Sequence, residues 1–231
     1  MDLKGNMGGC SFINVGSDYE MDITDLSVTG YGDSLSEGFE IQTLDDHGYT
    51  LKQYQWHDFT KKKVLYKGWY DFKAGRYVEP GEVKFPAGKG LWIYTTVDNL
   101  KLVCNGEVIT QAYGVKLQDK GLMVANPTPV DIKLMDMWAS GYGDSISEGI
   151  EVQTLDDHGY TLKQYQWHDF TKKKVAYYGW YDFKAGKYVK DLPQEEQDAI
   201  IVKAGKGLWA YCAMPDGFQY ILNFPAVVTE K

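Results

Sequence analysis

The chain has 231 residues, of which 44% are hydrophobic and 24% charged, a composition ordinary for a globular protein with a buried core. Its net charge is −8 and its densest basic runs are the lysines at 61–63 and 172–174, which argues against nucleic-acid binding. No apolar run reaches the ~20 residues that a membrane span requires, and no secretory signal pattern is visible.

An internal duplication dominates the sequence. Residues 30–78 align without a gap with residues 141–189 at a shift of 111, and 43 of the 49 pairs are identical. Residues 87–92 match residues 204–209 at a shift of 117, so the second copy carries six extra residues in its acidic stretch at 191–198. We therefore predict two domains of one fold, residues 1–113 and 114–231, the second with an insertion at 191–199.

The predicted elements are short strands separated by turn residues. In chain order we expect strands at 11–15, a hairpin over 39–56, and strands at 64–70, 83–85, 91–95 and 100–104. The second copy begins with a strand at 122–125, and Pro193 with the acids after it predicts the only helical stretch, at 192–197. This spacing predicts an all-β chain of two tandem homologous antiparallel β-sandwich modules.

The hairpin over 39–56 has the clearest pattern. Its turn at 45–48 holds Asp45 and Gly48, and a four-residue loop would place Ile41 opposite Lys52, whereas a three-residue loop shifts the pairing by one. In the first register the core face carries Phe39, Ile41, Thr43, Thr50, Lys52, Tyr54 and Trp56.

The opposite, outward face is the predicted interaction face. Its polar residues are unchanged between the copies, which indicates either a recent duplication or a surface that is needed twice. Amides both donate and accept hydrogen bonds, so such a row suits a polar partner or a neighbouring subunit. The predicted interaction residues are Glu40, Gln42, Gln53, Gln55, His57 and their copies Glu151, Gln153, Gln164, Gln166 and His168.

Repeated aromatic residues form a second set of candidates. Aromatic rings stack on sugars, but core packing is the simpler interpretation of most of them. Trp92 and Trp209 lie in apolar Leu-Trp-Ile/Ala-Tyr runs and are expected to be buried. The candidates for sugar stacking are Trp56, Trp69, Tyr70, Trp167, Trp180 and Tyr181.

Catalytic and metal-binding patterns are weak. His57 precedes Asp58, but neighbours on a strand point to opposite faces, so we predict that the protein is not an enzyme and uses no cofactor. Cys10, Cys104 and Cys212 do not repeat between the copies and are expected as free thiols, with a Cys10–Cys104 bridge as the alternative. Loop carboxylates are weak calcium candidates, with turn formation as the alternative: Asp33, Asp45, Asp46, Asp144, Asp156 and Asp157.

The segment at 121–129, Gly-Leu-Met-Val-Ala-Asn-Pro-Thr-Pro, and the later Ala-Gly-Lys-Gly-Leu-Trp at 204–209 carry a resemblance. They resemble small β-sandwich repeat modules of exported or surface bacterial proteins, although the first copy lacks both prolines at 10–16. The resemblance implies an extracellular or cell-surface, non-catalytic module.

These observations predict a structural or interaction protein of the bacterial surface or of a secreted assembly, with two equivalent interaction faces. Its partner is expected to be a protein or further copies of itself. A two-site carbohydrate-binding module and a virion or filament subunit are the alternatives.

Overall fold

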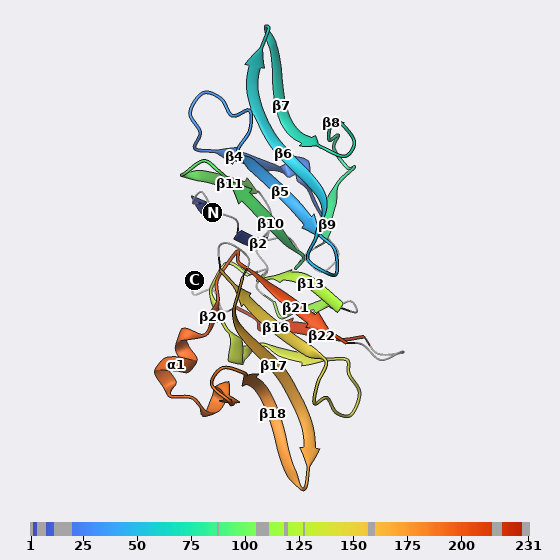
Figure 1. The fold of residues 1–231 in the computed structure, drawn as a ribbon, viewed down its shortest axis with the longest axis vertical. Helices are drawn as coiled ribbons and strands as arrows, with labels where there is room; N and C mark the ends of the chain where they lie inside the picture. The colour runs from blue at the N-terminus through green and yellow to red at the C-terminus, as the bar shows by residue number, and fades with distance from the viewer. Residues whose placement is uncertain are drawn as a thin grey trace.

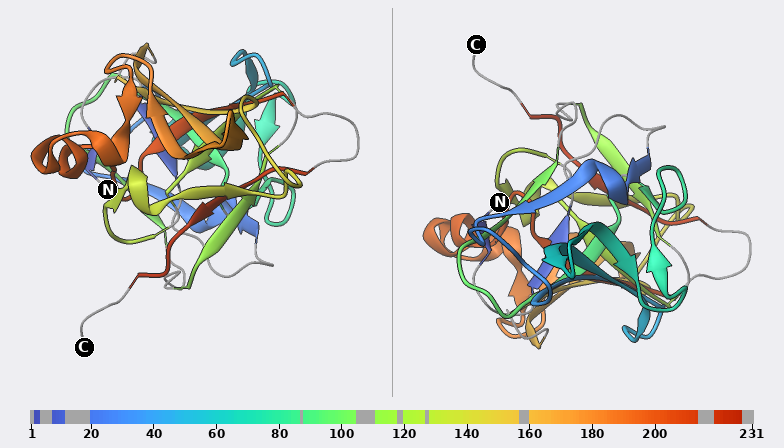
Figure 2. Two further views of the ribbon diagram at one scale, coloured as in Figure 1. Left: turned by 90° about the horizontal axis from the view of Figure 1, so that it is seen from below. Right: turned by 90° about the horizontal axis from the view of Figure 1, so that it is seen from above.

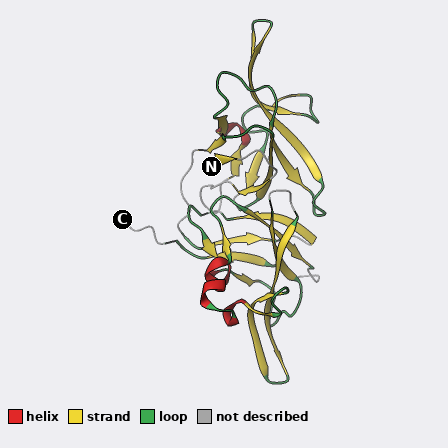
Figure 3. Cartoon of the chain, turned by 60° about the vertical axis from the view of Figure 1, so that its left-hand side comes forward, coloured by secondary structure: helices red, strands yellow, loops and turns green. Residues whose placement is uncertain are grey.

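The structure, a computed structural model, describes residues 2–3, 8–11, 20–86, 88–104, 111–117, 120–126, 128–156, 160–213 and 219–227. The fold is all-β, as predicted, and its sheets are antiparallel (Figure 3). Among these residues the one α-helix is α1 (Gln194–Ala199), which lies in the predicted insertion with Glu195 and Glu196 in its first turn. No helix in the described part of the chain is long and apolar enough to cross a membrane.

Each copy contributes a six-stranded sheet with the same strand order. The order is β2-β10-β5-β6-β7-β8 in the first copy and β13-β21-β16-β17-β18-β19 in the second. In the first copy these strands are β2 (Gly8–Ser11), β5 (Phe39–Leu44), β6 (Thr50–Lys61), β7 (Val64–Asp71), β8 (Arg76–Tyr77) and β10 (Gly90–Thr95). In the second they are β13 (Lys120–Ala125), β16 (Ile150–Leu155), β17 (Thr161–Lys172), β18 (Val175–Asp182), β19 (Lys187–Tyr188) and β21 (Gly207–Cys212).

Smaller sheets complete each copy, in the orders β1-β11-β4 with β3-β9, and β12-β22-β15 with β14-β20. The first set comprises β1 (Asp2–Leu3), β3 (Glu20–Asp22), β4 (Leu26–Thr29), β9 (Lys84–Pro86) and β11 (Leu100–Cys104). The second comprises β12 (Tyr113–Lys116), β14 (Ile132–Lys133), β15 (Trp138–Ser140), β20 (Ile201–Val202) and β22 (Ile221–Phe224). Short 3₁₀ turns are η1 (Ile23–Asp25), η2 (Leu134–Asp136) and η3 (Val189–Asp191).

The two-stranded sheets of the two copies pair equivalent residues, which supports the sequence alignment on both sides of the insertion. Met21 faces Phe85 in β3–β9, and Ile132 faces Val202 in β14–β20. Met21 and Ile132 correspond at the shift of 111, and Phe85 and Val202 at the shift of 117. Phe85 and Val202 are therefore equivalent residues with different volumes.

Each copy has its own hydrophobic core, built from the alternating inward residues that the sequence predicts. In the first copy the centre of this core includes Phe39, Ile41, Tyr54, Trp56 and Trp69. In the second it includes Ile150, Val152, Tyr165, Trp167 and Trp180. Cys212 belongs to the second core as a free thiol, whereas the side chains of Cys10 and Cys104 lie outside the described residues.

The predicted register of the β5–β6 hairpin is wrong by two residues. Ile41 faces Tyr54 rather than Lys52. The turn closes as a three-residue loop, in which Asp45 N donates to Tyr49 O at 2.9 Å, and a β-bulge at Leu51, near the start of β6, adds one more position. Because side chains alternate with a period of two, an even error leaves the predicted inner and outer faces of β5 unchanged.

The molecule is elongated, with the first copy in its upper half and the second in its lower half (Figure 1). The β6–β7 and β17–β18 hairpins project at opposite ends, while α1 projects from one side (Figure 2). The predicted strand at 11–15 lies outside the described residues except for its first residue, which ends β2.

Candidate binding site at the junction of the two copies

The ten predicted interaction residues lie on equivalent outer sheet faces. Gln42 faces Gln53, and Glu40 faces Gln55, across β5 and β6. The second copy repeats this register with Gln153 opposite Gln164 and Glu151 opposite Gln166. Nine of the ten side chains are half-buried and Gln164 is exposed, so the structure brings them together as two polar patches rather than as isolated surface residues.

Hydrogen bonds connect the side chains of each patch. Thr50 Oγ1 donates to Gln42 Oε1 at 2.8 Å, and the Nε2 groups of Gln42 and Gln53 both donate to the Glu40 carboxylate. Thr50 was predicted on the core face, and the extra residue of the bulge, Leu51 in β6, brings it to this outer face instead. The second copy repeats the network. Thr161 Oγ1 donates to Gln153 Oε1 at 2.7 Å, and the Nε2 groups of Gln153 and Gln164 both donate to the Glu151 carboxylate, at 2.7 and 2.8 Å. The carboxylate thus fixes the orientation of the amides before any partner binds.

A histidine lies at the end of each patch. His57 Nδ1 is 2.7 Å from the Tyr77 hydroxyl, Nε2 is 2.9 Å from Gln55 Oε1, and the ring stacks on Tyr70 at 5.4 Å. Burial lowers the pKa of His57 below its ordinary value, so the ring is neutral at pH 7. His168 has the same contacts with Tyr188, Gln166 and Tyr181, and burial lowers its pKa as well.

The acid beside the histidine faces the other side of the strand, as the sequence predicts. Asp58 accepts a hydrogen bond from Tyr31 at 2.8 Å and pairs with Lys67 at 3.0 Å. Burial opposes ionisation of Asp58, but these two partners outweigh it and hold the pKa of the carboxyl below its usual range. His57 and Asp58 therefore belong to separate contact networks and do not form an acid–base pair.

Both patches extend sideways to a tryptophan. Trp92 faces Gln42 across β10–β5, and Trp209 faces Gln153 across β21–β16. Trp92 is buried as predicted, but Trp209 is only half-buried, and neither ring is part of a core cluster. Alternation directs the neighbours of both tryptophans inward and places both indoles on the outer faces. The expected substantial burial therefore holds fully for Trp92 and only in part for Trp209.

The patches meet at a cavity of about 410 Å³ between the copies. Four of its lining positions are contributed twice, once by each copy, and Met123, His47 and Gly48 complete the wall. A volume of this size suits a small ligand or a few side chains of a partner. The duplicated lining residues are Gln42 and Gln153, Leu44 and Leu155, Thr50 and Thr161, and Trp92 and Trp209.

Direct contacts hold the copies together beside the cavity. Ala125 N donates to Gly88 O at 3.0 Å, and Lys120 pairs with Asp46 at 2.9 Å, which lowers the pKa of the Asp46 carboxyl. Gly90 packs so closely that a Cβ there would lie 2.2 Å from Met123 Cγ. The glycine is required by this approach of β10 to β13, not by an unusual backbone angle.

The candidates for sugar stacking separate into two groups. The rings of Trp56, Trp69, Trp167 and Trp180 are all buried in the cores and leave little face for a sugar. Tyr70 and Tyr181 are half-buried on the outer faces, each stacked on a histidine.

The second copy has an aromatic cleft of about 280 Å³, whose lining includes two of the predicted sugar-stacking residues, Trp167 and Trp180, but whose rim the sequence did not predict. Its rim includes Trp138, exposed Tyr178 and Lys190. The equivalent residues of the first copy are Ser27, Lys67 and Glu79, so this cleft belongs to one copy only. Its signal was present in the sequence, since Lys67 and Tyr178 are one of the six differences in the aligned block.

The loop carboxylates fit the turn interpretation better than calcium binding. Asp45 Oδ1 accepts from the backbone amides of His47 and Tyr49, and Asp156 Oδ1 accepts from that of Tyr160. Asp33 and Asp144 are exposed, and Asp157 lies outside the described residues. Within the described ranges no three His, Cys, Asp or Glu side chains are grouped for a metal.

Comparisons of the chain with protein families, with curated proteins and with solved structures found no match.

Proposed function

We propose that this is a non-catalytic interaction protein that binds a protein partner across its two polar patches and the junction cavity. One observation carries the proposal: the cavity is lined by the same residues from both copies, where the two patches meet. A shared site gives a physical reason for the unchanged polar residues, because a change in either copy alters the same cavity.

The chemistry of the site favours a polypeptide partner. Amide side chains can donate to and accept from backbone peptide groups, and the Glu40 and Glu151 networks hold them in place. Tryptophan is enriched among the residues that dominate protein–protein binding energy, and Trp92 and Trp209 lie where the patches converge.

The architecture and setting of the protein are part of the proposal. We propose two tandem β-sandwich domains, residues 1–113 and 114–231, which the shared strand order and the separate cores support. The resemblance described above supports a place on the bacterial surface or in a secreted assembly, where the simplest partner is a second copy of the chain.

Sedimentation velocity over a range of concentrations tests self-association. The parent should form larger species, and a Gln53→Ala, Gln164→Ala variant should remain monomeric with an unchanged melting temperature. Alanine is chosen because a glutamate at 53 would oppose Glu40, which accepts from Gln53 Nε2. Lys73→Ala with Lys184→Ala, an equivalent exposed pair in another loop, is the control. A variant that associates like the parent would show that the patches are not the interface.

Carbohydrate binding is the second candidate function, and the aromatic cleft of the second copy favours it. Glycan-array binding that disappears in a Trp138→Ser, Tyr178→Lys variant would support it. Those are the first copy's own residues at these positions, so the variant should fold. This result would point to one sugar site per chain rather than the two that the duplication suggested.

A further inference from the structure

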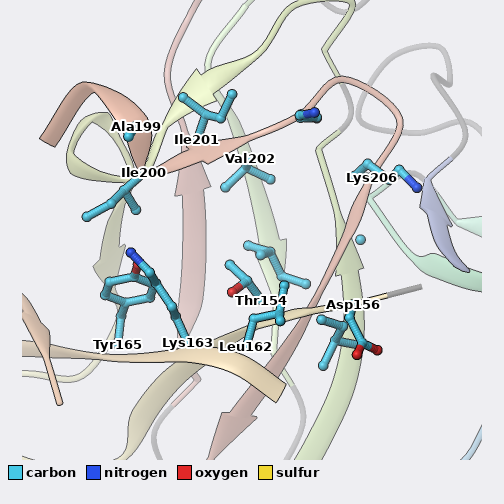
Figure 4. A pocket seen from close by; sticks show the side chains of 14 residues that line it. Thr154, Asp156, Leu162, Lys163, Tyr165, Ala199, Ile200, Ile201, Val202 and Lys206 are labelled. Carbon is cyan, nitrogen blue, oxygen red and sulfur yellow. The ribbon is translucent and has the colours of Figure 1, made fainter. Parts of the chain in front are cut away.

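A second cavity, of about 400 Å³, lies within the second copy, on the inner side of the β16–β17 hairpin. Figure 4 shows Tyr165 and Lys163 rising from β17 toward Ile200, which follows α1. Thr154 and Val202 also line the space. This cavity shares Leu155 with the lining of the junction cavity but is otherwise lined by different residues, and the proposed function does not use it.

A change of one residue explains why the space exists. In the first copy the Phe85 ring packs edge-on against Tyr54, with ring centroids 6.5 Å apart. The equivalent pair in the second copy is Val202 and Tyr165, so a ring has been replaced by an isopropyl group. Buried Thr43 in the first copy likewise corresponds to Thr154, which is only half-buried.

The insertion supplies a wall for the space instead of filling it. Residues from the end of α1 into β20, including Ala199, Ile200 and Ile201, line the cavity. Ile201 stands where the first copy has the exposed Lys84, so the wall here is apolar. The second copy thus has a cavity beside the position where the first copy has a ring, with aliphatic side chains along one wall.

Tyr165 lines the cavity, and its hydroxyl is buried. The hydroxyl has no hydrogen-bond partner in the described structure, although buried polar groups are almost always paired. Burial, together with the Asp182 carboxylate, raises the pKa of Tyr165, so the group is a protonated donor. An unpaired buried donor on a residue that lines a cavity favours a ligand that brings an acceptor.

Lysines line the cavity, and Lys163, Lys203 and Lys206 are all exposed, whereas Asp156 is the one acid among the described lining residues. Lys163 stands beside Tyr165, and Lys206 lies apart from them (Figure 4). A carboxylate near Lys206 would be attracted to its ammonium group while the apolar body lay between Val202 and Ile200.

We propose that the second copy binds a small aromatic carboxylate whose ring occupies the position of the Phe85 ring of the first copy. A hydroxyl or carbonyl on the ring accepts the hydrogen bond from Tyr165, and the carboxylate faces Lys206. The first copy, with its space filled by Phe85, has no equivalent site.

Calorimetric titration with 4-hydroxybenzoate tests the proposal, with benzoate and phenol as probes that lack one polar group each. The parent should bind one 4-hydroxybenzoate per chain and bind both simpler probes more weakly. Val202→Phe restores the first copy's residue and should abolish binding while keeping or raising the melting temperature. Failure of the parent to bind any of the three probes would overturn the proposal.

Tyr165→Phe provides an independent test that leaves the ring in place. It should weaken 4-hydroxybenzoate binding about tenfold, the value of one hydrogen bond, and leave benzoate binding unchanged. The Gln53→Ala, Gln164→Ala variant should bind like the parent, which separates this site from the junction. Equal loss of both ligands in Tyr165→Phe, or full binding by Val202→Phe, would contradict the assigned site.

Discussion

Single hydrogen bonds anchor the largest buried side chains. Trp69 Nε1 donates to the Leu26 carbonyl at 2.9 Å, and Trp180 Nε1 donates to that of Met137 at 2.8 Å. Each bond joins the long hairpin of a copy to its small sheet region. The sequence predicted these rings as core, but not their acceptors, because nothing in a strand pattern specifies a contact across 43 residues.

Replacing Trp69 with Phe should therefore lower the free energy of unfolding by about 2 kcal/mol, because the buried Leu26 carbonyl loses its donor as the core loses volume. Urea titration measures this loss. Trp180→Phe should show a similar value, since the contact is repeated. A loss near zero in either variant would show that water replaces the indole donor.

Stability should decrease when the pH falls below neutrality, because burial lowers the folded-state pKa values of His57 and His168 below 6.5. The unfolded chain then binds protons first, so stability is full above pH 6.5 and is lost as the pH falls toward the folded-state pKa values. At His168 the Glu148 carboxylate opposes this shift.

Thermal unfolding between pH 8 and pH 5 measures the effect, and a His57→Gln, His168→Gln variant should show a flatter profile. The carboxyls with lowered pKa values, such as Asp22 and Asp58, lose stabilisation only below their ordinary value of 3.8, in a separate window. An unchanged slope in the variant would assign the pH dependence to other groups.

At the scale of elements, alternation was the most reliable signal. It predicted Phe39 and Ile41 inside and Glu40 and Gln42 outside. These assignments are correct although the predicted hairpin register is wrong by two residues. The bulge that contributed to the error could not be predicted, because no residue around Leu51 in β6 distinguishes a bulged strand from a regular one. The helix in the insertion was predicted because proline followed by acids is a local signal.

The lysine turns of the two projecting hairpins are strained. Lys62 and Lys63 have φ values of 50° and 68°, and Lys173 and Lys174 have 49° and 65°. Positive φ at both positions is the type I′ geometry, which favours Asn-Gly because side chains other than Gly and Asn disfavour it.

Replacing Lys62-Lys63 with Asn-Gly should raise the free energy of unfolding by about 1 kcal/mol through relief of this strain. Chemical denaturation is the measurement, and the same change at 173–174 is the matched variant. A destabilised variant would mean that the lysine side chains contribute more at the hairpin tip than the turn geometry costs.

At the scale of the whole molecule, the junction was the feature that the sequence did not predict. Outward alternation identifies Gln42 and Gln153 as surface residues of their own sheets, but it does not say which surface meets the other copy. The cavity within the second copy was hidden for a related reason: Phe85 and Val202 become equivalent only once the alignment shift changes after the insertion.

Gly90→Ala should separate the copies without disturbing either core, because the added methyl group would collide with Met123. Calorimetry should then resolve two unfolding transitions, one for each copy, whereas in the parent the unfolding of the two copies is more strongly coupled. Partner binding at the junction should also be lost. A single unshifted transition would show that β13 moves aside at little cost.

The covalent link between the copies has a consequence for dilution. Two separate chains, each with half of the junction, would build the cavity only at concentrations above their dissociation constant. Here one polypeptide carries both halves, and the effective concentration of one for the other is fixed by the connection rather than by the amount of protein. The junction cavity should therefore persist at any dilution, and its occupancy should depend on the concentration of the ligand alone.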